Sequence, residues 1–155
     1  LNNNIKSYQL FIGERPLKNI FASWKLNFKK NDKHYVHKGL KKETNEKSIT
    51  LDNFVEKIDR KIDFVKIDTD GHEYEVLQSG IKFLKRDKPI IHIEFAPYLH
   101  SEYGFFTEDI IDLIQKLNYE FYTENLNKIK NIREYSKTII NTSENFFLLI
   151  KDIKK

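Results

Sequence analysis

The segment Ile62-Asp63-Phe64-Val65-Lys66-Ile67 is mostly apolar and ends abruptly at the acidic turn Asp68-Thr69-Asp70-Gly71. A short run of this kind, stopped by turn residues, is typical of a buried strand. A second such run, residues 90–95, follows Pro89. Between the two runs, apolar residues recur at helical spacing. Because strands joined by a helix run parallel in one sheet, this pattern predicts an α/β fold with a mostly parallel sheet.

Other segments extend the alternation of strands and helices. Thr50 and Thr107 are predicted N-caps of two helices, each with apolar residues on one stripe. The stretch after Gly71 is predicted to form a single helix, with Leu77, Gly80, Ile81 and Leu84 at the same spacing. Further strands are predicted at residues 7–12, 119–122 and 146–150, with a short one at Tyr35-Val36.

The composition excludes several classes of protein. With 155 residues, 39% of them hydrophobic, the chain has the size of one domain and enough apolar material for a core, so a disordered chain is excluded. Without cysteine, a disulfide framework, a thiolate metal site and a thiol nucleophile are excluded. No window approaches the ~18 apolar residues of a membrane span. We therefore expect no membrane span and a cytoplasmic location.

The net charge of +4 comes with lysines concentrated between residues 29 and 42. Arginine, which suits bidentate contacts with phosphate and bases, is scarce and scattered. Solvated surface lysines are therefore the favoured interpretation, and we expect no nucleic-acid partner. Trp24, Phe28 and Tyr35 lie among the lysines and leave a nucleic-acid surface open as the alternative.

Asp68 to Glu73 form an acidic cluster at a strand end, with three carboxylates and His72 in six residues. In open α/β sheets, ligands bind beyond the carboxyl ends of the strands, and neighbouring strands would place this turn beside residues 94–100. Asp70 alone is equally well explained as a helix cap. For the whole cluster a functional site is favoured, because the carboxylates repel one another unless a ligand or proton relieves the repulsion.

Three enzyme classes place Asp-x-Asp after an apolar strand. Metal-dependent glycosyltransferases use such carboxylates to hold a divalent ion, which would assign that role to Asp68-Thr69-Asp70. Haloacid-dehalogenase-like phosphatases use Asp-x-Asp-Gly, but they expect Thr or Val where this chain has His72. A catalytically inactive domain that only binds a partner is a further alternative.

A longer match favours the third of the enzyme classes that place Asp-x-Asp after an apolar strand. Three blocks of the sequence together resemble the FkbM family of S-adenosylmethionine-dependent methyltransferases. They are Thr50-Leu51-Asp52-Asn53-Phe54-Val55, the stretch from Ile62 through the acidic turn to Val76-Leu77, and Pro89-Ile90-Ile91-His92-Ile93-Glu94. The resemblance covers roughly residues 48–150. The chain departs from the family pattern at Asp70, where Glu is more usual, and at Ser79-Gly80, where a Gly-Ala-like pair is more usual.

The resemblance implies a Rossmann-like class I methyltransferase sheet with a C-terminal antiparallel hairpin, formed here by residues 119–122 and 146–150. Residues 62–67 would be its fourth strand, residues 90–95 its fifth and residues 7–12 its third. Its first two strands, with their Gly-rich cofactor turn, have no counterpart, and no Gly-x-Gly occurs in the chain. We therefore expect residues 1–155 to form a single methyltransferase-like domain that is incomplete at its N-terminus. Residues 1–47 would hold the third strand and an irregular region, and residues 48–155 the core. The absence of methionine, with Leu1 first, agrees with this expectation.

The resemblance also implies S-adenosylmethionine as cofactor and a small-molecule or glycan hydroxyl as the methyl acceptor. Asp68 is the predicted base for the acceptor proton, or a ligand of a divalent cation. Glu94 is predicted as a second ligand or a substrate hydrogen-bond acceptor. His72 and Glu73, on the first helical turn, complete the predicted catalytic set.

Four further residues lie within or after the second apolar run. His92, in the middle of a predicted strand, is interpreted as a satisfied core histidine. His100 is a weak candidate for a substrate contact. Tyr98 and Tyr103 are candidates for the wall of an acceptor pocket.

Overall fold

A computed structural model describes residues 4–13 and 48–151. The predicted strand at Tyr35-Val36 and the lysine-rich, aromatic stretch around it lie outside the described residues. The elements in chain order are β1 (Phe11–Ile12), β2 (Ser48–Ile49), α1 (Leu51–Val55), β3 (Phe64–Ile67), α2 (Glu73–Ser79), α3 (Ile81–Asp87), β4 (Ile90–Phe95), α4 (Pro97–His100), the 3-10 helix η1 (Ser101–Tyr103), α5 (Thr107–Lys116), β5 (Tyr119–Thr123), α6 (Ile132–Ser136) and β6 (Glu144–Ile150).

The main sheet has four strands in the order β3-β4-β6-β5. β3 and β4 pair in parallel, and β6 is antiparallel to both of its neighbours. The α/β fold and the antiparallel pairing of the last two strands are therefore confirmed. The sheet is mixed, because β6 inserts between β4 and β5. Three of the four strands, β3, β4 and β5, run in the same direction, as expected for a mostly parallel sheet. Of the three pairings, however, only the one between β3 and β4 is parallel.

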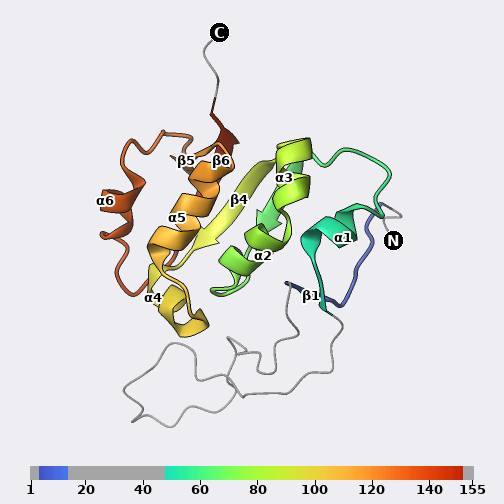
Figure 1. Ribbon diagram of the computed structural model, residues 1–155. Helices are drawn as coiled ribbons and strands as arrows, with labels where there is room; N and C mark the ends of the chain where they lie inside the picture. The colour runs from blue at the N-terminus through green and yellow to red at the C-terminus, as the bar shows by residue number, and fades with distance from the viewer. Residues whose placement is uncertain (1–3, 14–47, 152–155) are drawn as a thin grey trace.

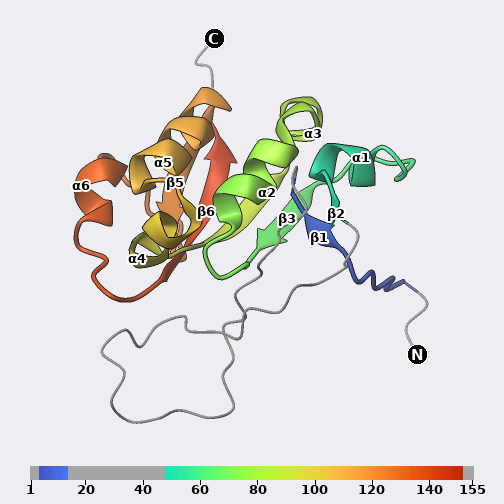
Figure 2. The ribbon, with the colours of Figure 1, turned by 60° about the horizontal axis from the view of Figure 1, so that its bottom comes forward.

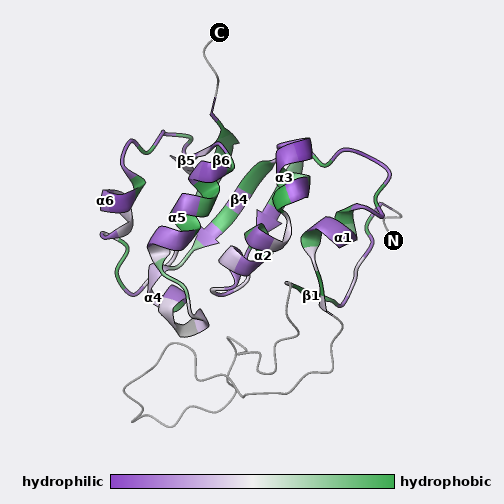
Figure 3. Ribbon diagram, viewed as in Figure 1, coloured by the Kyte–Doolittle hydropathy of each residue, from purple (hydrophilic) through white to green (hydrophobic). Residues whose placement is uncertain are grey.

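Helices α2, α3 and α5 lie on one face of this sheet (Figures 1 and 2). Alternate residues of β4 are buried against them, and Ile91, Ile93 and Phe95 are each 0% exposed. The stripe predicted for α5 is confirmed, because Ile110 and Ile114 belong to the same core cluster. β4 is coloured hydrophobic along much of its length, whereas the helices in front of it carry alternating bands (Figure 3). Burying one such side chain stabilises the folded protein by about 1.5–3 kcal/mol. The apolar side chains between these helices and this face of the sheet form most of the core.

The stretch predicted as one helix is two helices that meet at Gly80, whose backbone (φ −117°, ψ 18°) is not helical. Asp52 accepts hydrogen bonds from the backbone N–H groups of Lys82 and Phe83, so it satisfies the first turn of α3 from outside that helix. A Cβ on Gly80 would lie 2.7 Å from a methyl carbon of Leu51. The close packing of α1 against this junction therefore explains the break.

Of the two predicted N-caps, Thr50 is confirmed and Thr107 is not. The Thr50 hydroxyl accepts a hydrogen bond from Asn53 N (3.1 Å), as predicted for the start of α1. At α5, Phe106 occupies the N-cap position, and the Asp109 carboxylate accepts a hydrogen bond from Phe106 N at 2.7 Å. Thr107 is instead the first residue of α5, so its predicted role as N-cap is wrong. Its hydroxyl interacts with His100.

The strand predicted at residues 7–12 is reduced to β1, which pairs in parallel with β2 and not with the four-stranded sheet. β2 was not predicted. Because a pair of two-residue strands has almost no hydrophobic period, neither its length nor its partner can be recognised locally. β1 lies beside α1 and β2 (Figure 2).

The helices of the described part of the chain are short. The longest of them, α5, has 10 residues, and none is long and apolar enough to cross a membrane.

Candidate active site

The carboxyl ends of β3 and β4 lie side by side. In the parallel register Ile67 is opposite Ile93, so the next residues along the two strands, Asp68 and Glu94, are neighbours. The predicted juxtaposition of the acidic turn and the segment after β4 is therefore confirmed. Two carboxylates from different strands meet at the sheet edge where α/β proteins bind ligands.

Glu73 fastens the acidic turn from inside the protein. One of its carboxylate oxygens, Oε1, accepts hydrogen bonds from Thr69 N at 3.0 Å, Thr69 Oγ1 at 2.9 Å and Gly71 N at 3.2 Å. The side chain is 0% exposed, and Oε2 has no hydrogen-bond partner among the described residues. The structure thus places Glu73 where it holds the turn that carries Asp68 and Asp70.

Removing the Glu73 carboxylate should loosen this turn. We expect Glu73→Ala to lower the free energy of unfolding by about 2–4 kcal/mol, because three donors lose a buried charged acceptor. Amide hydrogen exchange at Thr69 and Gly71, followed by NMR, should accelerate.

Glu75→Ala is the matched control for this variant. Glu75 lies on the same helix, and within the described residues its carboxylate interacts with His72 Nδ1, at 3.4 Å. It should cost less than about 1 kcal/mol and leave the turn amides protected. Equal losses in the two variants would contradict the role assigned to Glu73.

His72 is also buried, at 7% exposure. Its ring lies against the Tyr103 ring, with centroids 4.0 Å apart, and meets the Phe11 ring edge-on at 5.7 Å. Its Nε2 atom is buried without a hydrogen-bond partner among the described residues. These contacts make His72 a link between β1, the turn and η1, away from the open side of the sheet edge.

Asp68 and Glu94 are the accessible members of the predicted set. The Asp68 side chain is 48% exposed and pairs with Lys66. Glu94 is half-buried and accepts a hydrogen bond from Ser143 Oγ at 2.6 Å. Burial raises the pKa of Glu94, as do the nearby charges of Asp68, Glu73 and Asp70, against the opposing effect of the Ser143 hydrogen bond. Glu94 therefore holds its proton to a higher pH than an ordinary glutamate.

The two histidines within and after β4 are both largely buried. The His92 side chain is 16% exposed, with its ring 4.8 Å from the Phe147 ring and its Nε2 3.7 Å from Glu124 Oε1. His100 is 1% exposed, and burial lowers its pKa to about 4. A substrate in solvent does not reach it in this conformation.

Of the two tyrosines considered for an acceptor pocket, Tyr103 covers the turn. A Cβ on Gly71 would lie 2.4 Å from its ring, and Leu99 closes the same space. Tyr98 is half-buried on α4. Sequence reasoning did not single out Ser143, because its position beside Glu94 depends on β6 pairing with β4.

A comparison with protein-family models matches the methyltransferase FkbM domain over residues 1–121. The chain belongs to the FkbM methyltransferase family. The FkbM match includes the acidic turn and both parallel strands, and it ends inside β5. No curated protein and no solved structure matches the chain.

FkbM membership confirms the resemblance carried by the Thr50-Leu51-Asp52 start, the acidic turn and the strand after Pro89. The structure gives this motif a physical basis. Asp52 caps α3, and Ser79 Oγ accepts a hydrogen bond from Leu51 N while donating to the Val76 carbonyl. The block that begins at Thr50 is thus in contact with the end of α2 and the start of α3.

Proposed function

We propose that this FkbM-family protein is an S-adenosylmethionine-dependent methyltransferase that methylates a hydroxyl group of a sugar or another small molecule. One observation carries the proposal: an accessible carboxylate, Asp68, lies beside a second one, Glu94, at the carboxyl ends of two parallel strands. The mixed α/β sheet with its antiparallel final pair fits a Rossmann-like class I domain. A cytoplasmic location belongs to the same proposal.

The donor set at this edge fits part of the cofactor. S-adenosylmethionine supplies an electrophilic methyl group on a positively charged sulfur and also carries an ammonium group. Carboxylates attract positive charge, so Asp70 is the group that would face this part of the molecule, while Asp68 faces the acceptor. A divalent cation is not supported by the donor geometry, because the described residues contain no group of three or more His, Asp or Glu side chains placed to hold one. The mechanism therefore assigns no role to a metal.

Asp68 would accept the proton of the acceptor hydroxyl as its oxygen takes the methyl group, while the bond from that methyl to the cofactor sulfur breaks and the sulfur leaves as a neutral thioether. Asp68 would then return the proton to water. Glu94 accepts a hydrogen bond from a neighbouring hydroxyl of the acceptor. Ser143 keeps the Glu94 carboxyl group oriented. The turn held by Glu73 fixes the distance between these groups, since misplacement of reacting groups is costly.

Calorimetric titration with S-adenosylmethionine tests the proposal. We expect saturable binding of the cofactor by the full-length protein, and weaker binding by its Asp70→Asn variant. Binding of a nucleotide-sugar with Mn²⁺ in its place would support the glycosyltransferase interpretation. Absence of binding to either small molecule, by a folded protein, would leave the interpretation of a partner-binding domain.

A further inference from the structure

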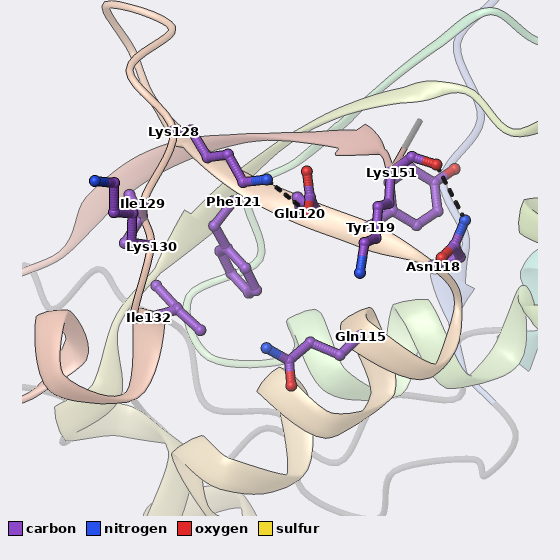
Figure 4. A pocket seen from close by; sticks show the side chains of 10 residues that line it. All are labelled: Gln115, Asn118, Tyr119, Glu120, Phe121, Lys128, Ile129, Lys130, Ile132 and Lys151. Carbon is purple, nitrogen blue, oxygen red and sulfur yellow. Dashed lines mark hydrogen bonds and ion pairs between the residues drawn. The ribbon is translucent and has the colours of Figure 1, made fainter. Parts of the chain in front are cut away.

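A hollow of about 230 Å³ lies between α5, β5 and the segment before α6, away from the acidic turn (Figure 4). Lys128, which lines it, has its Nζ 2.7 Å from Glu120 Oε1, so these two charges neutralise each other. Phe121 and Ile132, at 2% and 4% exposure, offer a ligand little apolar surface. A deeply buried polar atom without a partner lies instead on α4, beside the acidic turn.

The segment formed by α4 and η1, residues 97–103, covers one side of the acidic turn, and we call it the α4–η1 cover. A Cβ on Gly71 would lie 2.4 Å from its Tyr103 ring and 3.1 Å from its Leu99 Cβ. The Tyr103 ring also lies against the His72 ring, with centroids 4.0 Å apart. The cover ends at Gly104, where φ is +86° and an added Cβ would meet nothing within 4 Å. Gly104 therefore gives the cover an unobstructed joint to the next segment.

His100 anchors this cover in the core. Its side chain is 1% exposed, and its ring centroid lies 5.2 Å from that of Phe95 and 5.0 Å from that of Phe105. Nδ1 lies 3.0 Å from Thr107 Oγ1, whereas Nε2 is buried without a hydrogen-bond partner among the described residues. The charge that acts on the ring is that of Glu108, in the first turn of α5. It favours the protonated form, but its effect is smaller than that of burial.

A proton on this imidazole would make donors of both ring nitrogens. The Nε2–H group would then have no acceptor, and an incompletely paired charge in an apolar site is costly. If the cover leaves the core, the ring of His100 reaches water and takes up a proton at its ordinary pKa of about 6.5. In the closed position burial lowers this pKa to about 4. The closed position is therefore most stable above about pH 6.5, and it loses stability as the pH falls towards about 4.

We propose that the α4–η1 cover opens in response to acid: neutral His100 holds it against the acidic turn, and protonation of His100 releases it. Release lifts the Tyr103 ring from the turn and uncovers His72, whose Nε2 atom is buried without a partner among the described residues. The turn itself stays in place, because Glu73 holds it from inside the protein. The cover thus controls access to one side of the site proposed for methyl transfer.

Amide hydrogen exchange of the full chain tests this opening, followed by NMR between pH 7.5 and 4.5 and corrected for intrinsic exchange rates. The amides of Leu99, Gly104 and Phe105 report on the cover, because they donate to carbonyls within or next to it. Their opening equilibrium should rise on the order of 50-fold over this range, since the open form binds the proton at the ordinary histidine pKa. The ring signals of His100 should titrate well below pH 6 in the same samples.

Two variants remove the titrating group. His100→Gln keeps a polar side chain, and His100→Leu keeps an apolar one in contact with Phe95 and Phe105. In either variant the pH response of the cover amides should fall to less than about fivefold. His92→Gln is the matched control, because it removes a histidine of β4 outside the cover, and it should keep the full response.

Three results would overturn the proposal. The first is a His100 pKa near 6.5, and the second is an undiminished pH response in both His100 variants. The third is equal acceleration at the buried amides of Ile91 and Ile93, which would mean that acid unfolds the whole sheet instead of releasing the cover. These measurements use neither cofactor nor turnover, so failure of the proposed methyl transfer would not affect them.

Discussion

Replacing Gly71 with alanine should destabilise the fold by roughly 3 kcal/mol or more, measured by urea denaturation. Two costs add at this position. Its φ of +102° is a conformation that residues with a Cβ rarely adopt, at a cost of about 1–2 kcal/mol. The new methyl group would also lie 2.4 Å from the Tyr103 ring and 3.1 Å from Leu99 Cβ, and overpacking of this kind costs about 1–3 kcal/mol.

Gly104→Ala separates these two costs. Gly104 also has a positive φ, +86°, but a Cβ there would meet nothing within 4 Å. It should lose only the conformational part, about 1 kcal/mol. Shortening Tyr103 to leucine in the Gly71→Ala background should recover part of the difference. If the two glycine variants lose the same stability, the contact with Tyr103 does not limit the packing of the turn.

The Asp68→Asn variant should lower kcat for methyl transfer at least about 100-fold, because the amide cannot accept the hydroxyl proton. The measurement is formation of S-adenosylhomocysteine with a panel of hydroxylated acceptors. The KM for the cofactor should change much less than kcat. Stability should change by less than about 0.5 kcal/mol, since the side chain is 48% exposed and its pairing with Lys66 lies at the surface.

Asp63→Asn is the control for a change of charge on the same segment. Asp63 is exposed, lies 3.5 Å from Lys61 Nζ and precedes β3 instead of following it. Its variant should keep full turnover. If the Asp68→Asn variant keeps its turnover within about twofold of the parent protein, Asp68 is not the base. The proposed methyl transfer would then have no proton acceptor.

The parts of the site that follow from local sequence were predicted correctly. The apolar run before Asp68 ends in turn residues, so a strand end was recognisable there. The rule that parallel strands place their carboxyl ends together then brought Asp68 beside Glu94. The cap at Thr50 was equally local, since a hydroxyl three residues before an N–H group needs no other part of the chain.

Contacts between distant segments explain the incorrect expectations. Gly80 interrupts the predicted single helix because Asp52, about thirty residues earlier, caps the second half. Phe106 takes the N-cap position predicted for Thr107, and the Thr107 hydroxyl interacts with His100 on α4. Neither contact changes the spacing of apolar residues from which helices are predicted.

The sequence by itself determined the α/β class, the acidic strand end and membership of the FkbM family, because all three depend on residue order over short stretches. Only the tertiary structure decided which of the four predicted site residues are accessible and which are buried. Asp68 and Glu94 reach the open edge, whereas His72 and Glu73 are 7% and 0% exposed. Burial is set by Tyr103, Phe11 and the fold of the turn, which lie apart in sequence and meet only when the chain is folded.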